Sequence, residues 1–103
     1  MQRQGDLLII KINELPKEVK KLKTLIVAYG EITGHKHRLT RDSTEVLEPI
    51  KVDIKFPIKF LNIVENDTLV HEEHKTVELE KGFYKIIYQR EFDLIEGYRQ
   101  VID

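Results

Sequence analysis

The chain is divided into short apolar runs of strand length, and this division constrains the fold more than any other feature of the sequence. Asp6 to Asn13 is apolar on both sides of an alternating pattern, which suits a central strand. Thr76 to Glu80 alternates apolar and acidic residues, and Lys81-Gly82 joins it to the long run from Phe83 to Phe92. A glycine turn between two alternating runs predicts a β-hairpin, with its second strand the longest in the protein.

The remaining segments predict further strands and one helical turn. Pro16 suits a first helical turn, and Leu15, Val19 and Leu22 recur at helical spacing, so Glu14 to Thr24 is expected to be a short helix or a helical loop. Strands are expected at Leu25 to Tyr29 and at His35 to Leu39. Two more are expected within Val46 to Val64, where Pro49 and Pro57 are confined to edges, turns or bulges. A hairpin turn is expected over Glu65 to Thr68.

These elements predict an all-β fold. With 103 residues and no long break rich in Gly, Ser or Pro, the chain is expected to form one domain over residues 1–103. About seven to nine short strands at regular spacing, with one short helical excursion, favour a β-sandwich or a small barrel.

Composition excludes several classes of function. The net charge is −1 despite a charged fraction of 34%, so no basic field indicates nucleic acid. The chain has no cysteine, so any metal must be held by histidine and carboxylate ligands. No apolar run approaches the roughly 20 residues that span a bilayer, and the expected location is therefore the cytoplasm, without a membrane.

All four histidines fall in two tight pairs, and each pair borders a strand-like run. His35 and His37 are two residues apart, so a strand presents both imidazoles on one face. In His71-Glu72-Glu73-His74 a regular strand would send His74 to the far side, whereas a turn or bulge would bring both histidines together.

One site built from two strands is the resulting prediction. Its metal ligands are expected to be His35, His37 and His71 with either Glu73 or His74, a set that suits Zn²⁺, Mn²⁺, Fe²⁺ or Ni²⁺. The alternative interpretation is that the histidines are exposed or hydrogen-bonded polar residues without a function.

Part of the histidine region resembles the cupins, small metal-binding β-barrels. In that family a glycine leads a His-x-His motif and an acid follows. Here Gly30 precedes His35-Lys36-His37, Asp42 stands where the family usually has Glu, and the second cupin motif has no counterpart.

Nearly the whole chain resembles a family of small uncharacterised prokaryotic and phage proteins. The shared blocks are Gln4-Gly5-Asp6, Gly30-Glu31 with Thr33-Gly34-His35 and His37-Arg38, His71-Glu72-Glu73-His74, and Gln89-Arg90-Glu91-Phe92. The family usually has Tyr at the position of Phe92. Because it has no established activity, the resemblance supports the location of a site and supplies no mechanism.

Three functions are compatible with these residues. The first is a site for a divalent metal, which would activate water or hold a small anionic ligand. The second is a non-enzymatic interaction module, whose histidine surface binds a protein partner or another copy of the chain as a homo-oligomer. The third is metal-free acid–base chemistry on a phosphodiester. The catalytic residues predicted for an enzymatic role are His71, Glu73 and Arg90, with Arg90 or Lys36 stabilising negative charge.

Overall fold

The computed structural model describes residues 1–29, 34–50 and 58–89, and in these ranges the fold is almost entirely β. No helix in this part of the chain is long and apolar enough to cross a bilayer. The strands described are β1 (Gln2–Gln4), β2 (Leu7–Ile12), β3 (Val19–Lys21), β4 (Ile26–Tyr29), β5 (Lys36–Arg38), β6 (Glu45–Pro49), β7 (Ile58–Ile63), β8 (Asp67–Leu69), β9 (Val77–Leu79) and β10 (Gly82–Tyr88).

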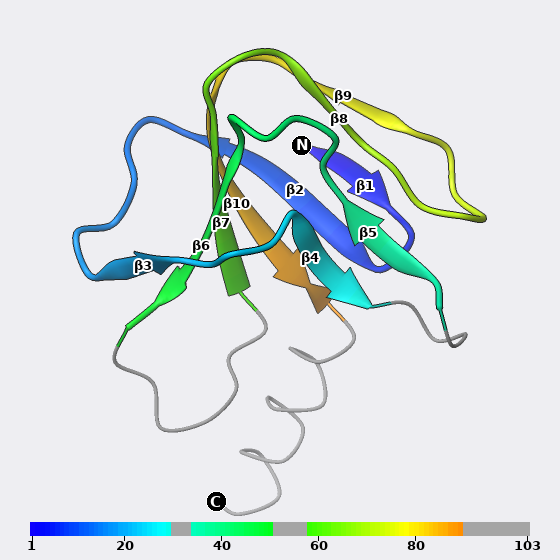
Figure 1. Ribbon diagram of the computed structural model, residues 1–103, viewed down its shortest axis with the longest axis horizontal. Coiled ribbons are helices and arrows are strands. Elements are labelled where there is room, and N and C mark those ends of the chain that lie inside the picture. The colour runs from blue at the N-terminus through cyan, green and yellow to red at the C-terminus, as the bar shows by residue number, and fades with distance from the viewer. Residues whose placement is uncertain (30–33, 51–57, 90–103) are drawn as a thin grey trace, which may run out of the picture.

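Six of these strands form one antiparallel sheet in the order β1-β2-β10-β7-β6-β3 (Figure 1). β10 pairs with β2 on one side and with β7 on the other, so both of its hydrogen-bonding edges are occupied. Leu7 and Ile9 alternate with less buried neighbours along β2, and the same alternation places Tyr84 and Ile86 of β10 in the interior.

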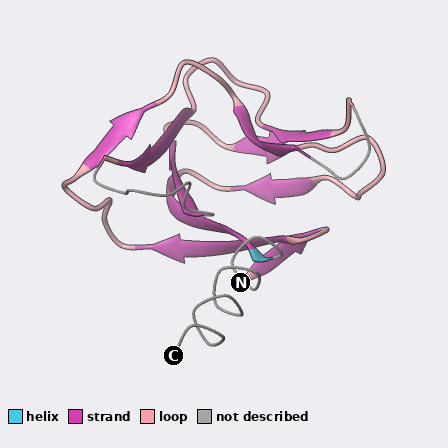
Figure 2. Cartoon of the chain, turned by 90° about the horizontal axis from the view of Figure 1, so that it is seen from below, coloured by secondary structure: helices cyan, strands magenta, loops and turns pink. Residues whose placement is uncertain are grey.

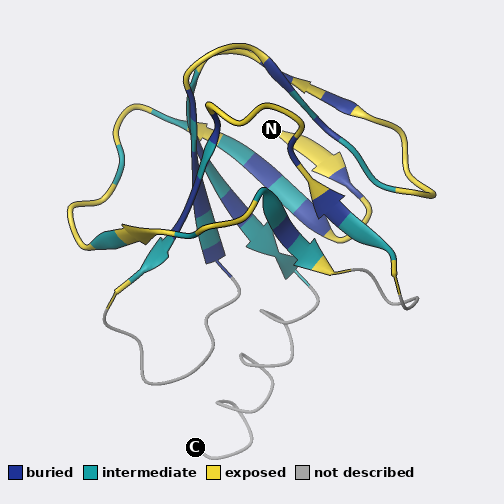
Figure 3. Cartoon of the chain, viewed as in Figure 1, coloured by how far each residue is buried: buried dark blue, intermediate teal, exposed yellow. Residues whose placement is uncertain are grey.

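Two short ribbons, β4–β5 and β8–β9, lie over the inner face of this sheet. They are joined to each other where Arg38 and Val70 exchange backbone hydrogen bonds of 3.0 and 2.9 Å. Figure 2 shows the strands arranged around a common interior, and Figure 3 shows their buried segments. Val27, Leu39 and Leu69 from the ribbons share one core with Leu61 and Ile86 from the sheet. The expectation of an all-β fold is confirmed.

The positions of most expected strands are confirmed. β2, β4 and β5 lie within the three runs expected to be strands before residue 40, and β6 and β7 are the two strands expected between Val46 and Val64. β10 is the longest strand, with 7 residues from Gly82 to Tyr88. The part of the expected strand beyond Gln89 lies outside the described residues.

The expected helix over Glu14 to Thr24 is wrong. Val19–Lys21 forms the edge strand β3, which pairs with Leu47–Pro49 of β6. Leu15 and Val19 pack on a second apolar cluster, around Phe60. Pairing with the open edge of β6 and packing on this cluster outweigh the local helical spacing, since tertiary context overrides intrinsic propensity.

The two expected hairpins are also wrong. β9 pairs with β8 rather than with β10, because β2 and β7 already occupy both edges of β10. The turn after β7 does not return the chain to β7. It carries the chain to the β8–β9 ribbon, where Asp67 begins β8.

Candidate functional site

Strand β5 carries His37, which is buried, and His35 lies directly before the strand. Along this strand His37 and Leu39 are buried, whereas Arg38 between them is exposed, as alternation requires. Only 3% of His37 is accessible, and His35 is partly buried. The expectation that one strand carries both histidines is met only for His37, because β5 begins at Lys36 and His35 lies just before it.

The second pair follows β8, at the end of the pairing between Val70 and Arg38. Residues 71–74 leave strand geometry and bend, and this bend brings the imidazole of His74 within 4.5 Å of that of His71, measured between ring centroids. The backbone N–H of Glu73 donates to His71 Nδ1 at 3.0 Å and closes the bend. Of the two geometries considered for this segment, the structure has the bend.

The two pairs meet, with His71 in the middle. Its ring centroid lies 4.4 Å from that of His37 and 5.7 Å from that of His35, and the rings of His37 and His74 are stacked at 6.0 Å. The prediction that both pairs come together is confirmed. We refer to His35, His37, His71 and His74 as the histidine cluster.

Two carboxylates border the histidine cluster. Glu72 accepts a hydrogen bond of 2.8 Å from the backbone N–H of Lys36, and Glu73 Oε1 lies 3.8 Å from His35 Nδ1. One donor atom from each of His35, His71 and Glu72 lies within 4.8 Å of the other two. Of the three predicted catalytic residues, His71 and Glu73 are therefore at the site, and Arg90 lies outside the described residues.

Sequence reasoning did not assign a role to Gln4, Gly5 or Glu72. Gln4 is 2% exposed, and its Oε1 lies 2.9 Å from His37 Nδ1. Gly5 has φ +58°, and a Cβ at this position would come within 2.6 Å of His74 Nε2. The one signal that pointed to the first two residues was the Gln4-Gly5-Asp6 block of the family resemblance.

The electrostatics around His37 and His71 favour neutral imidazoles. Burial, followed by the neighbouring His71 and His74, lowers the pKa of His37 to about 4, although Asp6 and Glu72 oppose the shift. Burial and then His74 lower the pKa of His71. The hydrogen bond from Lys36 lowers the pKa of the Glu72 carboxyl. At neutral pH these two rings therefore keep a lone pair, and Glu72 is ionised.

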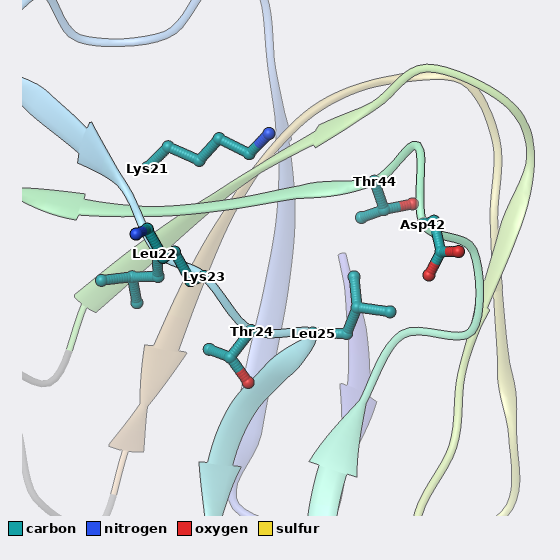
Figure 4. Close-up of a pocket in the computed structure, with 7 residues that line it drawn as sticks. All are labelled: Lys21, Leu22, Lys23, Thr24, Leu25, Asp42 and Thr44. Carbon is teal, nitrogen blue, oxygen red and sulfur yellow. The ribbon is translucent and has the colours of Figure 1, made fainter.

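A larger hollow, next to β3 and β6, lacks such a convergence of chemistry. The hollow in Figure 4 has a volume of about 420 Å³ and is lined by residues 21–25 with Asp42 and Thr44. Lys21 pairs there with Glu45 at 3.4 Å, and no histidine contributes to the lining. A smaller hollow of about 140 Å³ includes His71 and Glu72 with Lys36 and Arg38. The candidate site is therefore at the histidine cluster.

Comparison with known proteins gives a family without an assigned activity. No curated protein and no solved structure matches the chain. The resemblance to cupins gains no support from these comparisons. Residues 3–89 match a domain of unknown function, DUF8820, and this range contains the whole histidine cluster and Gln4. The chain belongs to the DUF8820 family.

Proposed function

We propose that the histidine cluster binds a divalent transition-metal ion and leaves a coordination position open for water or a small anionic ligand. The observation that carries this proposal is the convergence of donor atoms from His35, His71 and Glu72 within 4.8 Å of one another. Ligands of tetrahedral Zn²⁺, bound at about 2.0–2.2 Å, lie about 3.4 Å apart. Metal binding would therefore draw the three donor atoms closer together, at a rim where Glu72 is exposed and His35 and His71 are partly buried.

The composition of the donor set supports a borderline metal. Two imidazoles and one carboxylate are the three-ligand set of several catalytic zinc sites, in which water takes the fourth position. His37 and His74, with ring centroids 4.4 and 4.5 Å from that of His71, offer further imidazole nitrogens. Imidazole favours Zn²⁺, Ni²⁺ or Fe²⁺ over Mg²⁺ or Ca²⁺, which prefer oxygen ligands.

The metal-free acid–base alternative has weaker support. A histidine pair of that kind needs one protonated ring as the acid and one neutral ring as the base at the working pH. The pKa values of His37 and His71 are both lowered, so neither ring holds a proton to donate as an imidazolium at neutral pH. Neutral imidazoles are instead the form that metals bind.

His71 is the residue on which the site depends, because its ring contacts the other three histidine rings. We expect chelator-treated wild-type protein to bind Zn²⁺ stoichiometrically in titration calorimetry. Its unfolding free energy should rise by about 2.7 kcal/mol when free Zn²⁺ is 100 times the dissociation constant. His71→Ala should weaken binding by more than about 100-fold, since even substitutions outside the ligand set typically cost about 10- to 100-fold.

A matched pair of acids controls for the loss of negative charge. Glu72→Gln removes the candidate carboxylate ligand, whereas Glu78→Gln removes an exposed carboxylate on β9 away from the cluster. Only the first variant should weaken Zn²⁺ binding. A wild-type protein that binds none of Zn²⁺, Mn²⁺, Fe²⁺ and Ni²⁺ at a defined stoichiometry would overturn the proposal.

A further inference from the structure

The side-chain amide of Gln4 has a fixed orientation. Its Nε2 donates to the backbone carbonyls of Leu69 and Lys75, at 2.9 Å in each case. Carbonyl oxygens only accept, so the amide nitrogen must face these two groups, and this assignment does not depend on seeing hydrogens. The two carbonyls flank the segment that carries His71 and His74, so one buried side chain spans the base of that segment.

The other end of the same amide determines which nitrogen of His37 carries the proton. Gln4 Oε1 lies 2.9 Å from His37 Nδ1, and both residues are buried. An amide oxygen cannot donate, so the hydrogen bond requires a proton on Nδ1. In a neutral ring the lone pair is then on Nε2.

We propose that Gln4 is a positioning residue, which holds neutral His37 as the Nδ1–H tautomer so that Nε2 is the nitrogen available to a ligand. His71 has the opposite arrangement, because its Nδ1 accepts the N–H of Glu73 and its neutral ring therefore carries the proton on Nε2. The cluster thus contains two touching imidazoles in opposite tautomers. His37 can bind a metal through Nε2 without any change of protonation. For His71 to bind a metal, Nδ1 must lose the hydrogen bond from the Glu73 N–H, or Nε2 must lose its proton.

The neighbouring residue shows that the β1–β2 turn shapes the same site. Gly5 follows Gln4, and the His74 ring lies where the Cβ of any other residue would be. Gln4 therefore fixes the ring of His37, and Gly5 leaves room for the ring of His74. The role of Gln4 in metal affinity rests on the proposed function, whereas the tautomer of His37 does not.

The direct test is long-range ¹H–¹⁵N NMR of the chelator-treated wild-type protein near neutral pH. We expect the His37 signals of a protonated Nδ1 and an unprotonated Nε2, and the reverse for His71. A His37 ring with the proton on Nε2, or an even mixture of tautomers, would overturn the inference. This measurement needs neither a metal nor a variant.

The role of Gln4 itself is tested with Gln4→Ala, and Gln2→Ala is its matched control. Both are glutamines of β1, but Gln2 is exposed, and its amide donates to Glu78 O at the long distance of 3.4 Å. We expect Gln4→Ala to mix the His37 tautomers and weaken Zn²⁺ binding by about 10- to 100-fold, as outer-shell substitutions do. Gln2→Ala should change neither.

The outcomes separate this inference from the proposed function. If Gln4→Ala weakens Zn²⁺ binding but leaves the His37 tautomer unchanged, Gln4 has a purely structural role and the inference is wrong. If the wild-type tautomer is as expected but no metal binds, the proposed function fails and the positioning of His37 by Gln4 stands. Should Gln4→Ala not fold, the wild-type spectrum still decides the tautomer.

Discussion

The two short ribbons each contain a buried polar residue, Asp67 on β8 and His37 on β5. Each is 3% exposed, but the two differ in their hydrogen bonding. Asp67 accepts hydrogen bonds from the hydroxyls of Thr40 and Thr44, at 2.5 and 2.6 Å. It also accepts from the backbone N–H groups of Thr40, Arg41 and Thr68, at 2.6 to 3.2 Å. His37 has a hydrogen bond to Gln4 on one side of its ring and other imidazoles beside it.

The comparison indicates what each centre is for. Both carboxylate oxygens of Asp67 accept hydrogen bonds from nearby donors. Most of these donors belong to the β5–β6 connection, so the carboxylate ties that connection to β8 and stabilises the fold. The histidine cluster gathers several titratable rings whose charged forms exclude one another. Such a concentration of titratable groups is more typical of a ligand site than of a purely structural one. The following predictions test this distinction.

The largest effect is expected from Asp67→Ala. The substitution leaves the buried hydroxyl of Thr44 and several partly buried donors without an acceptor. Each unsatisfied donor costs about 1–3 kcal/mol unless water replaces the carboxylate, so the unfolding free energy should fall by about 3 kcal/mol or more. Asp42→Ala is the control, because Asp42 is an exposed aspartate in the connection that Asp67 holds. Urea unfolding monitored by circular dichroism measures both. Equal small losses in the two variants would contradict the assigned role of Asp67.

Acid should destabilise the two centres in different pH ranges. The pKa of His37 falls from 6.5 to about 4 on folding, so the unfolded chain takes up this proton first. Stability is then complete above about pH 6.5 and falls by roughly 2–3 kcal/mol as the pH drops to about 4. His71, whose pKa is also lowered, contributes with the same sign.

Asp67 should add a second stage at lower pH. Burial alone would raise its pKa, but the hydrogen bonds from Thr40, Thr44, Thr68 and Arg41 lower it below 3.8. Its contribution is therefore present above about pH 3.8 and is lost below that value. Urea unfolding from pH 8 to pH 3, with a chelator present, measures both stages. His37→Asn should reduce the first stage and leave the second, and a stability that is flat between pH 6.5 and 4 would contradict the assignment.

A smaller effect is expected from Gly5→Ala. Its new Cβ would press on the His74 ring, and its φ of +58° is unfavourable for alanine, so a loss of about 1–2 kcal/mol is expected together with weaker Zn²⁺ binding. Gly82→Ala is the control, since φ is also positive there but the Cβ would meet only the flexible end of Lys11, 3.1 Å away. Thermal unfolding and Zn²⁺ titration distinguish them. Both variants should lose stability, and only Gly5→Ala should lose Zn²⁺ affinity.

Local patterns in the sequence determined the fold class and most strand positions. Alternation along Asp6 to Asn13 and along Thr76 to Glu80 records which side chains face a core, and this information is local. The position of His37 on a strand was readable for the same reason, although His35 lies just before that strand. Strand partners were not readable, because the free edges of β6 and β8 exist only once the sheets have formed.

The arrangement of the site was decided by tertiary structure. Nothing local to His71 and His74 distinguishes a strand from the bend that brings their rings together, and the Arg38–Val70 pairing is what places this bend beside His37. The sequence by itself determined which residue types could hold a metal, since a chain without cysteine leaves only histidine and carboxylate ligands. Only the tertiary structure decided that Gln4, 33 residues from His37, sets the proton on its ring, because that depends on a hydrogen bond between strands distant in the chain.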